Sequence, residues 1–281
     1  MEEFKISVVI PTLNRKDFLK KAIDSVLKQK FSPHEIIVVD NLSSDGTLEM
    51  INADYPSVKT FVQSIKGVSA TRNLGIRKSE GNWIAFLDSD DQWHNEKLKM
   101  QVEHITEDEN QVFLSHTDET WYRDNEIINQ KLKHQKRGGF IFEFCLSLCC
   151  ISPSSSLVRR EIFDQIGFFD ENLDVCEDYD FWLRYCSQYP VNFVNRKLTY
   201  KYGGHSDQLS KKNWGMDRFR VESLEKLINS NSLKKEQMVM AAETLIKKIS
   251  IIVEGAKKRS NQAVFNRYLK KQNYWLGKLK E

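Results

Sequence analysis

Three short acidic stretches lie in order along the chain, and their positions indicate metal and phosphate chemistry. They are Asp40, Asp88-Ser89-Asp90 and Glu177-Asp178-Tyr179-Asp180. The first two each follow an apolar run that predicts a buried strand, and strand ends lie at the sheet edge where α/β proteins bind ligands. Two carboxylates flanking one residue can share a hard divalent cation, which in turn neutralises a diphosphate. We therefore expect a nucleotide diphosphate site, with the third stretch supplying a candidate base.

The second acidic stretch is the strongest single signal. Three acids within 88–91, directly after an apolar run, would repel one another without a cation. Asp90 is the expected main metal ligand, Asp88 is expected to bind metal or ribose, and Ser89 is expected beside them in the nucleotide site. The alternative is a cap for the helix that starts near Asn95, which would explain one of the three acids but not all.

The elements that must position these acids alternate along the first part of the chain. The alternation predicts a parallel sheet with helices on both faces. Neither GxGxxG nor a P-loop follows the first strand, which argues against a dinucleotide enzyme or a P-loop NTPase. The expected strands are 5–10, 35–39, 58–62 and 83–87, and the expected helices are 15–30, 47–51 and 67–79.

The second part of the chain mixes strands and helices, and it ends in two or three amphipathic helices after residue 214. The expected strands are 111–115, 119–122, 154–158, 191–195 and 198–202, with 127–130 pairing back as a hairpin, and the expected helices are 96–105, 140–149, 160–166 and 177–188.

Composition indicates a soluble globular protein with an uneven charge. The net charge of +3 is too small to indicate a nucleic-acid partner. Residues 214–281 hold 15 Lys and Arg against 7 Asp and Glu, so this segment is basic and the rest of the chain is acidic. The five cysteines contain no CxxC pair, and neither a signal peptide nor a run of ~20 apolar residues is present, so a reduced, cytoplasmic protein is expected.

Polar residues around the first strands are candidates for binding a nucleotide. Pro11 ends the first strand, and Thr12, Asn14 and Arg15 open a helix whose N-terminus favours an anion. An ordinary strand-to-helix turn is the alternative. Asp40 can accept hydrogen bonds from a base or a ribose, or it can cap the next helix.

The helix over 67–79 offers a second set of candidates. Lys66 precedes it, and Gly67 permits a close approach of the backbone. Arg72 can contact a phosphate or brace the acids at the sheet edge. A solvated position on the helix surface is the alternative for this arginine.

The order of these motifs resembles the inverting, non-processive family 2 glycosyltransferases with a GT-A fold. Each motif alone is weak, but five in the right order, spanning residues 4 to about 210, are specific. The resemblance implies an α/β fold with a mostly parallel central sheet flanked by helices. The catalytic domain is expected at 1–213, with a nucleotide-binding half (1–92) and an acceptor-binding half (93–213), followed by a helical extension at 214–281. The matching pieces are 9–15, 38–41, 67–75, 88–91 and 177–184.

The resemblance also implies a substrate and a mechanism. The donor is a nucleotide-sugar, with a UDP-sugar as the default because Asp40 can pair with a uracil N–H, although dTDP offers the same group. The cofactor is Mn²⁺ or Mg²⁺ on Asp90, and His205 in a late loop is a further metal ligand. The processive QxxRW signature is absent, so transfer of a single sugar to a carbohydrate or lipid-linked acceptor is expected.

The general base is expected among the acids at 177–180. The acceptor hydroxyl loses its proton as it attacks the anomeric carbon opposite the diphosphate, which inverts the configuration. Asp178 is the expected base, with Glu177 and Asp180 as the other candidates, and Arg184 is expected to pair with those two. The alternative is an acid-rich helix N-terminus, which the helix dipole favours anyway.

Two other functions and several roles for the tail stay open. A sugar nucleotidyltransferase also joins an α/β sheet to metal-binding acids, but it expects a glycine-rich loop that the residues after Pro11 lack. A non-catalytic binding protein is the second alternative. The basic tail can contact the inner face of an anionic membrane peripherally, cap the catalytic domain or form a homodimer.

Overall fold

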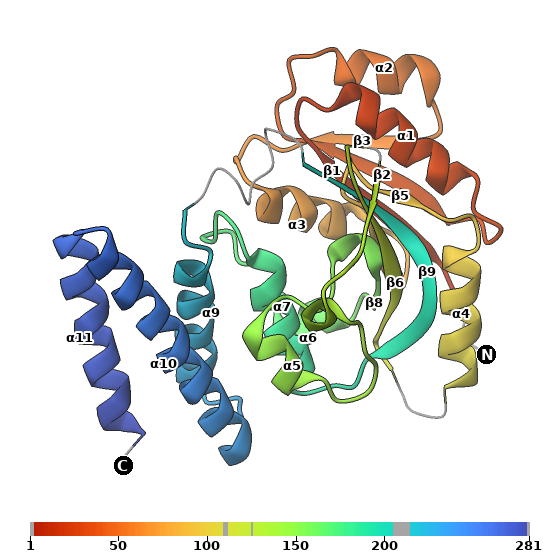
Figure 1. Cartoon of the computed structure of the whole chain (residues 1–281). Coiled ribbons are helices and arrows are strands. Elements are labelled where there is room, and N and C mark those ends of the chain that lie inside the picture. Colours follow the sequence, from red (N-terminus) through yellow and green to blue (C-terminus); the bar gives the residue numbers. More distant parts are fainter. Residues whose placement is uncertain (1–2, 109–111, 125, 205–213, 280–281) are drawn as a thin grey trace. The chain divides into compact units, whose positions relative to one another are not determined.

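The computed structural model describes residues 3–108, 112–124, 126–204 and 214–279 of the 281-residue chain. The chain divides into two compact units, whose elements are labelled in Figure 1. Unit 1 comprises Met1–Ile141, Cys150–Asp174 and Tyr189–His205, and unit 2 comprises Phe142–Cys149, Val175–Gln188 and Ser206–Glu281.

Unit 1 is built on a mixed sheet of nine strands within the described residues. The strand order is β3-β2-β1-β4-β8-β6-β9-β5, and β7 pairs with β6. The first four strands are parallel as predicted, whereas β8 runs antiparallel to β4 and β6, so the sheet as a whole is mixed. The bounds are β1 Ile6–Thr12, β2 Glu35–Asp40, β3 Lys59–Val62, β4 Trp83–Phe86, β5 Gln92–Trp93, β6 Leu114–Arg123, β7 Glu126–Ile128, β8 Ser156–Arg159 and β9 Asn192–Gly203.

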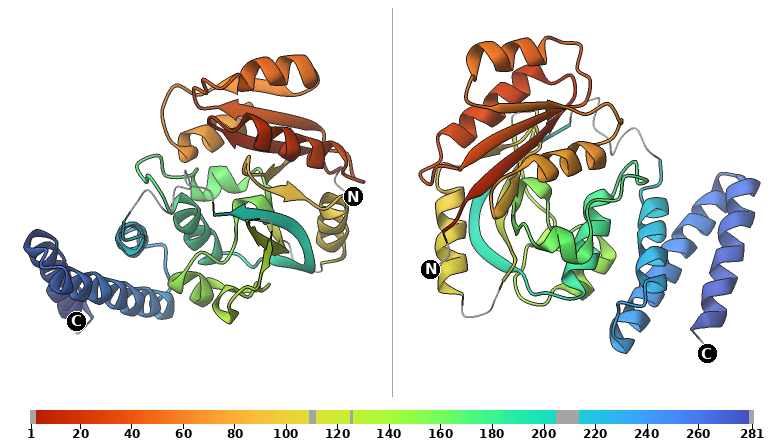
Figure 2. Two further views of the ribbon diagram at one scale, coloured as in Figure 1. Left: turned by 45° about the horizontal axis from the view of Figure 1, so that its top comes forward. Right: turned by 180° about the vertical axis from the view of Figure 1, so that it is seen from behind.

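Helices cover both faces of the parallel part of the sheet, as Figures 1 and 2 show. Every residue of β1 and β2 is buried, which explains their continuous apolar and β-branched sequences. The helices α1 and α2 pack on the face that carries Val8 and Val38. The helices of unit 1 are α1 Lys16–Leu27, α2 Thr47–Asp54, α3 Val68–Lys78, α4 Lys97–Glu107 and α6 Ile162–Ile166, with short 3₁₀ turns η1 Leu132–His134 and η2 Pro153–Ser155.

The helix α3 lies unusually close to the opposite face of the sheet. A Cβ atom added to Gly75 would stand 2.3 Å from Cγ1 of Val9 and 3.3 Å from Cγ2 of Val39. Only a glycine permits this approach, because any larger side chain would push the helix away from β1 and β2. The glycine therefore sets the distance between the sheet and the residues that α3 carries.

Two pairs of strands expected from the sequence are continuous in the structure. The strand β6 joins 111–115 with 119–122, and β9 joins 191–195 with 198–202. The parallel register of β6 and β9 shifts at Thr117 and Asp118, where β9 carries extra residues. This bulge interrupts the apolar pattern of both strands without ending their pairing. The predicted hairpin of β6 and β7 is confirmed.

Unit 2 is helical within its described residues. The expected tail consists of three helices there, and α5 and α7 group with them rather than with the sheet. The two compact units therefore do not correspond to the expected division of the chain into residues 1–213 and 214–281. None of the described helices combines enough length and apolar character to cross a bilayer. The bounds are α5 Phe142–Ser147, α7 Glu177–Cys186, α9 Asp217–Asn229, α10 Lys235–Lys258 and α11 Gln262–Lys278.

A lysine lies fully buried where α4 packs on the sheet of unit 1. The ammonium group of Lys97 donates a 2.8 Å hydrogen bond to Oε1 of Gln101 and lies 4.1 Å from the ring centroid of Trp93. Burial lowers the pKa of Lys97 well below its usual value. The ring face of Trp93 favours the charged form and works against this shift.

This burial predicts a specific pH dependence of stability. The unfolded chain keeps the Lys97 proton that the folded protein releases, so the free energy of unfolding should rise with pH from 7 toward 10. Each unit of pKa lowering corresponds to about 1.4 kcal/mol. We expect Lys97→Met to lose this part of the rise in urea unfolding at pH 7, 8.5 and 10. Lys99→Met, at an exposed position of the same helix, should keep it. An unchanged pH slope in Lys97→Met would mean that the buried amine stays charged.

Candidate active site

The carboxyl ends of three parallel strands meet at one edge of the sheet in unit 1. The strand β1 lies between β2 and β4, and its register places Thr12 opposite Asp40. Asp88 follows β4 within two residues. The structure thus brings the first two acidic stretches to the same edge, where α/β folds bind ligands.

Each acid of the second stretch has a cation from a different element. Nη2 of Arg72 on α3 lies 2.6 Å from Oδ1 of Asp88, and Arg15, directly before α1, forms an ion pair with Asp90. The third acid, Asp91, lies 2.9 Å from Nζ of Lys201 on β9. The expectation that only a bound cation relieves the repulsion is therefore incomplete, because side chains already supply three positive charges.

Burial and these charges set the protonation of the acids. Burial acts to raise the pKa of Asp88, but Arg72, Lys201 and Arg15 hold it below its usual value. Burial, with the neighbouring carboxylates of Asp90 and Asp88, raises the pKa of Asp91 to about 7, although Lys201 opposes this shift. Burial acts to lower the pKa of Lys201, but the acids around it raise the pKa above its usual value.

Besides Lys201, two further residues that sequence reasoning missed hold Asp91 in place. The Ser154 hydroxyl donates a 2.6 Å hydrogen bond to Oδ2 of Asp91 and accepts one from the Asp88 N–H at 3.1 Å. The backbone N–H of Tyr202 donates to Oδ1 of Asp91 at 3.1 Å. Neither Ser154 nor Lys201 belongs to a recognisable local motif, and only the pairing of distant strands reveals them. Asp88, Asp90 and Asp91 do not cap α4, because the N-cap residue of that helix is Glu96.

Two strained loops surround the end of β1 and β2. Asn14 and Leu42 both have positive φ, at 51° and 67°. The Asn14 N–H donates to Oγ of Ser43 at 2.8 Å, and Oδ1 of Asn14 accepts from the Ser44 N–H at 2.7 Å. Asn14 therefore ties the two loops together. Non-glycine residues held at positive φ are often found at ligand sites.

Unpaired buried polar atoms lie between these loops. Oδ2 of Asp40 accepts a 2.9 Å hydrogen bond from the Ser43 N–H. Oδ1 of Asp40 and Oγ1 of Thr12 are buried and have no hydrogen-bond partner within the described part of the chain. A buried polar atom without a partner is costly, and a ligand or an ordered water can supply the missing hydrogen bonds at these two atoms.

The remaining residues that were predicted to bind the nucleotide lie around the same edge of the sheet. The N–H of Gly67, whose φ is 127°, donates to Oδ1 of Asn41 at 3.0 Å. Pro11 and Ser89 are buried, and Lys66 is exposed. His205, the expected further metal ligand, lies outside the described residues.

The third acidic stretch opens α7 in unit 2. Asp180 pairs with Arg184 at 2.9 Å, as expected, and both Asp180 and Glu177 are buried. Asp178 keeps exposed surface, and its Oδ2 lies 3.3 Å from the Cys149 thiol. Asp178 has no ion pair within the described residues. It is the most accessible of the three acids.

The tail helices support α5 and α7 within unit 2. Lys248 of α10 is buried, donates to the Ser147 carbonyl at 2.7 Å and lies 3.3 Å from Asp217. Gln237 donates to the Ser187 carbonyl at the end of α7, at 2.8 Å. Lys248 thus ties α10 to α5 and α9, whereas the neutral side chain of Gln237 ties α10 to the end of α7.

The acids at the sheet edge fit a divalent cation in type. Asp88 and Asp90 offer hard carboxylate oxygens, and Mg²⁺ or Mn²⁺ commonly uses one or two carboxylates with water and substrate phosphates. No group of three or more His, Cys, Asp or Glu side chains is placed to hold a metal among residues 3–108, 112–124, 126–204 and 214–279. A metal on Asp90 must also displace Arg15.

Solved structures share this fold. TarS of S. aureus (residues 1–349, in complex with UDP-GlcNAc) has a TM-score of 0.76 and 20% identity, covering 94% of this chain and 79% of that chain. The mannosyltransferase PcManGT of Pyrobaculum calidifontis, in complex with GDP-Man and Mn²⁺, has a TM-score of 0.64 and 13% identity, covering 98% and 85%. The fold is therefore the GT-A type expected from the sequence, with a helical C-terminal region.

The sequence itself identifies the family. The model of Glycosyl transferase family 2 matches residues 7–167, and the chain belongs to this family. An uncharacterised glycosyltransferase of Rickettsia felis is 30% identical over 207 residues, which are 71% of this chain but only 33% of that protein. The chain thus spans about a third of the length of this relative. The E. coli protein WfgD, named UDP-Glc:alpha-D-GlcNAc-diphosphoundecaprenol beta-1,3-glucosyltransferase, is 26% identical over 69% of this chain and 75% of its own length.

The pairing of Lys201 with Asp91 predicts a strong coupling between the two side chains. Lys201→Met removes the cation from a buried acid whose pKa is already raised to about 7. It should lower the free energy of unfolding by about 3 kcal/mol at pH 9, where Asp91 is ionised in the wild type. The double variant Lys201→Met/Asp91→Asn should recover more than half of that loss in urea unfolding. Lys30→Met, which removes an exposed pair with Glu96, should cost less than about 1 kcal/mol. Simple additivity of the two substitutions would contradict the coupling.

Proposed function

We propose that the chain is an inverting glycosyltransferase that moves a single sugar from a UDP-sugar to an acceptor hydroxyl in the assembly of cell-surface polysaccharide or glycolipid. The family supports a glycosyltransferase, and the similarity to WfgD, named as a UDP-Glc-dependent enzyme acting on a diphosphoundecaprenol-linked sugar, supports a UDP-sugar donor and a lipid-linked acceptor. The observation that carries the proposal is that Oδ1 of Asp40 and Oγ1 of Thr12 are buried without a hydrogen-bond partner at the sheet edge where Arg72 and Arg15 pair with acids.

The nucleobase of the sugar donor is assigned to the loops around Asp40. Its unpaired Oδ1 can accept the N–H of uracil, and the Thr12 hydroxyl can bond a second polar atom. Asp40 has no exposed surface, so the nucleobase reaches it only when the loop after β2 opens. The strained conformation of Leu42 favours such an opening, because a residue of this type costs about 1 kcal/mol or more at positive φ.

The diphosphate is assigned to the arginines and the acids. Arg15 and Arg72 can turn their planar guanidinium groups from carboxylates to phosphate oxygens. A divalent cation bound to Asp90 and Asp88 would stabilise the charge that develops on the leaving diphosphate. When Arg15 leaves Asp90, its guanidinium group becomes available to phosphate and the Asp90 carboxylate becomes available to the cation.

The general base is assigned to Asp178. Asp180 is held by Arg184 and Glu177 is buried, whereas Asp178 has accessible surface. In the reaction the acceptor oxygen forms a bond to the anomeric carbon as the bond to the diphosphate breaks. The acceptor proton passes to Asp178, and the electron pair of the broken bond leaves with the diphosphate, so the configuration inverts.

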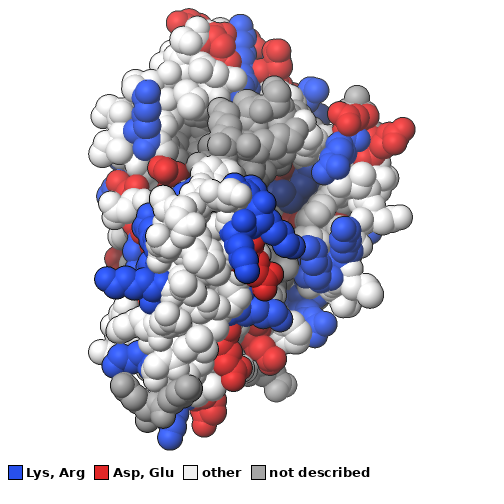
Figure 3. Space-filling view, turned by 60° about the vertical axis from the view of Figure 1, so that its left-hand side comes forward, with Lys and Arg blue, Asp and Glu red and all other residues white. Residues whose placement is uncertain are grey.

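Peripheral membrane contact through unit 2 is a further part of the proposal. Residues 214–281 have an excess of positive charge, and Trp214, Tyr274 and Leu276 are exposed. Figure 3 shows Lys and Arg side chains interspersed with acidic and uncharged surface on the face it draws. The excess of Lys and Arg favours contact with an anionic bilayer, where a lipid-linked acceptor would be found, and the interspersed acids keep this contact weak and reversible.

Nucleotide binding tests the donor assignment directly. We expect titration calorimetry with UDP, dTDP, GDP and CDP to show metal-dependent binding with uracil or thymine preferred. Asp40→Asn should weaken UDP binding roughly 10- to 100-fold, because the uracil N–H then meets a neutral amide in place of a charged acceptor. Asp90→Asn should remove the effect of Mn²⁺, while Asp174→Asn, at an exposed acid of unit 1, should change neither. Equal binding of GDP and UDP in wild type and Asp40→Asn would contradict the role of Asp40.

Kinetics test the base separately. Asp178→Asn should lower kcat for release of UDP from the preferred UDP-sugar by about 10²- to 10⁴-fold, because the acceptor proton loses its destination. Its affinity for UDP, measured by calorimetry, should stay that of the wild type. A variant that retains most of the turnover would assign the base elsewhere.

A further inference from the structure

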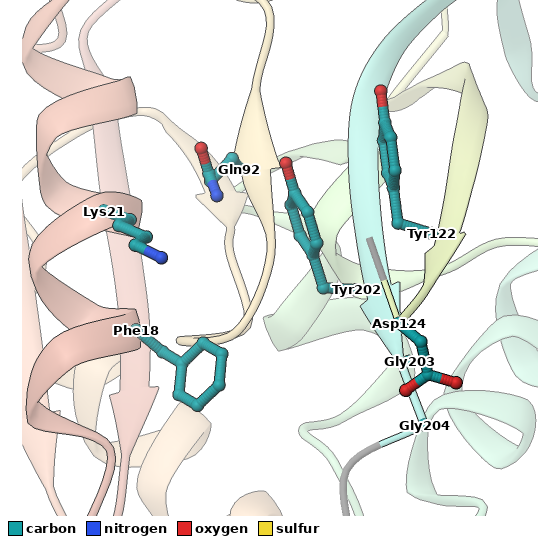
Figure 4. A pocket seen from close by; sticks show the side chains of 8 residues that line it. All are labelled: Phe18, Lys21, Gln92, Tyr122, Asp124, Tyr202, Gly203 and Gly204. Carbon is teal, nitrogen blue, oxygen red and sulfur yellow. The ribbon is translucent and has the colours of Figure 1, made fainter. Parts of the chain in front are cut away.

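A cavity opens in unit 1 between α1 and the strands β5, β6 and β9. Its volume is about 290 Å³, at the lower end of the range for small-molecule sites. Figure 4 shows Phe18 and Lys21 of α1 on one side and two tyrosines on the other, with Gln92 of β5 between them. The side chains that line it are Phe18, Lys21, Gln92, Tyr122, Asp124 and Tyr202.

The tyrosines form a preorganised aromatic wall. Tyr122 of β6 and Tyr202 of β9 are paired in the parallel register, and their rings stack with centroids 5.0 Å apart and planes at 14°. Tyr200 meets Tyr122 edge-on at 6.3 Å. Phe18, which is 37% exposed, supplies an aromatic side chain on the opposite wall. Stacked rings on paired strands keep their orientation without a ligand.

Polar groups of different kinds stand around this wall. Asp124 offers a carboxylate, Lys21 an ammonium and Gln92 an amide that both donates and accepts. A pyranose ring has apolar C–H faces and hydroxyls at its edge, so it can pack on aromatic side chains while its hydroxyls bond to such groups. Asp124 and Lys21 are both exposed, which leaves their charges available to a ligand.

The cavity is distinct from the proposed nucleobase position but adjoins the acids. In the sheet, β4, β8 and β6 separate β1 from β9. Successive side chains of a strand point to opposite faces, so Lys201 reaches Asp91 while Tyr202 lines the cavity. The backbone N–H of Tyr202 also bonds to Asp91. A ligand in the cavity would therefore lie near the acid cluster, on the opposite face of β9 from the side chain of Lys201.

We propose that this cavity is a second carbohydrate subsite, which binds one sugar residue of a glycan other than the sugar that is transferred. Its role for an acceptor glycan rests on the proposed glycosyltransferase function, but its binding of a pyranose does not. The size suits a single ring, and the combination of aromatic walls with a carboxylate, an ammonium and an amide suits a polyhydroxylated ligand.

Saturation-transfer NMR on the full chain tests the subsite without any transfer reaction. The probes are the methyl glycosides of glucose, galactose, mannose and N-acetylglucosamine, with uridine as a planar aromatic probe. At least one glycoside should bind with a Kd in the millimolar range, both with and without saturating UDP. Phe18→Ala and Asp124→Asn should each weaken that binding at least fivefold. Asparagine suits the positive φ of 52° at position 124, and Phe140→Ala, at a 78% exposed position outside the cavity, is the matched control.

The outcomes separate the subsite from the donor site. Absence of binding by all four glycosides, binding that both variants retain, or displacement of the glycoside by UDP would each overturn the proposal. Binding of uridine that depends on Phe18 and Asp124, without any glycoside, would also overturn it. UDP binding measured on the same samples shows whether a failure concerns the subsite alone. Glycoside binding in a protein that binds no nucleotide would support the subsite and refute only the donor assignment.

Discussion

The neutralisation of three carboxylates by three cations is the interaction on which the site in unit 1 depends. Asp88, Asp90 and Asp91 follow one strand, but their partners come from α3, from the start of α1 and from β9. A cluster of acids in a partly buried position is unstable alone. These contacts join residues that are 16, 75 and 110 positions apart in the sequence. The same three ion pairs hold the arginine and lysine side chains at the sheet edge.

The sequence predicted the parallel half of unit 1 well, for physical reasons. Strands buried on both faces read as continuous apolar runs, and the helices between them have regular periodicity, so β1 to β4 and α1 to α4 appear near their expected places. The order of acids and strands was enough to predict the edge at which Asp40 and Asp88 lie. The family and the GT-A fold, inferred from five weak motifs in order, are both confirmed.

The second half was less predictable because its pairing is long-range. The bulge at Thr117 and Asp118 breaks a pattern but not a strand, and β5 has only two residues, too few to show a period. Ser154 and Lys201 reach the acid cluster only through β8 and β9. The grouping of α7 with the tail helices likewise depends on tertiary packing, which no local motif encodes.

The close approach at Gly75 has a consequence for the evolution of donor specificity. Because α3 is held against Val9 and Val39 with no room for a Cβ atom, the helix that carries Arg72 has little freedom to shift as substitutions accumulate. The part of the site that carries Arg72 is thus a fixed frame. Under the proposed function, a change of donor nucleotide in a related chain would fall on the loops after β1 and β2 rather than on α3.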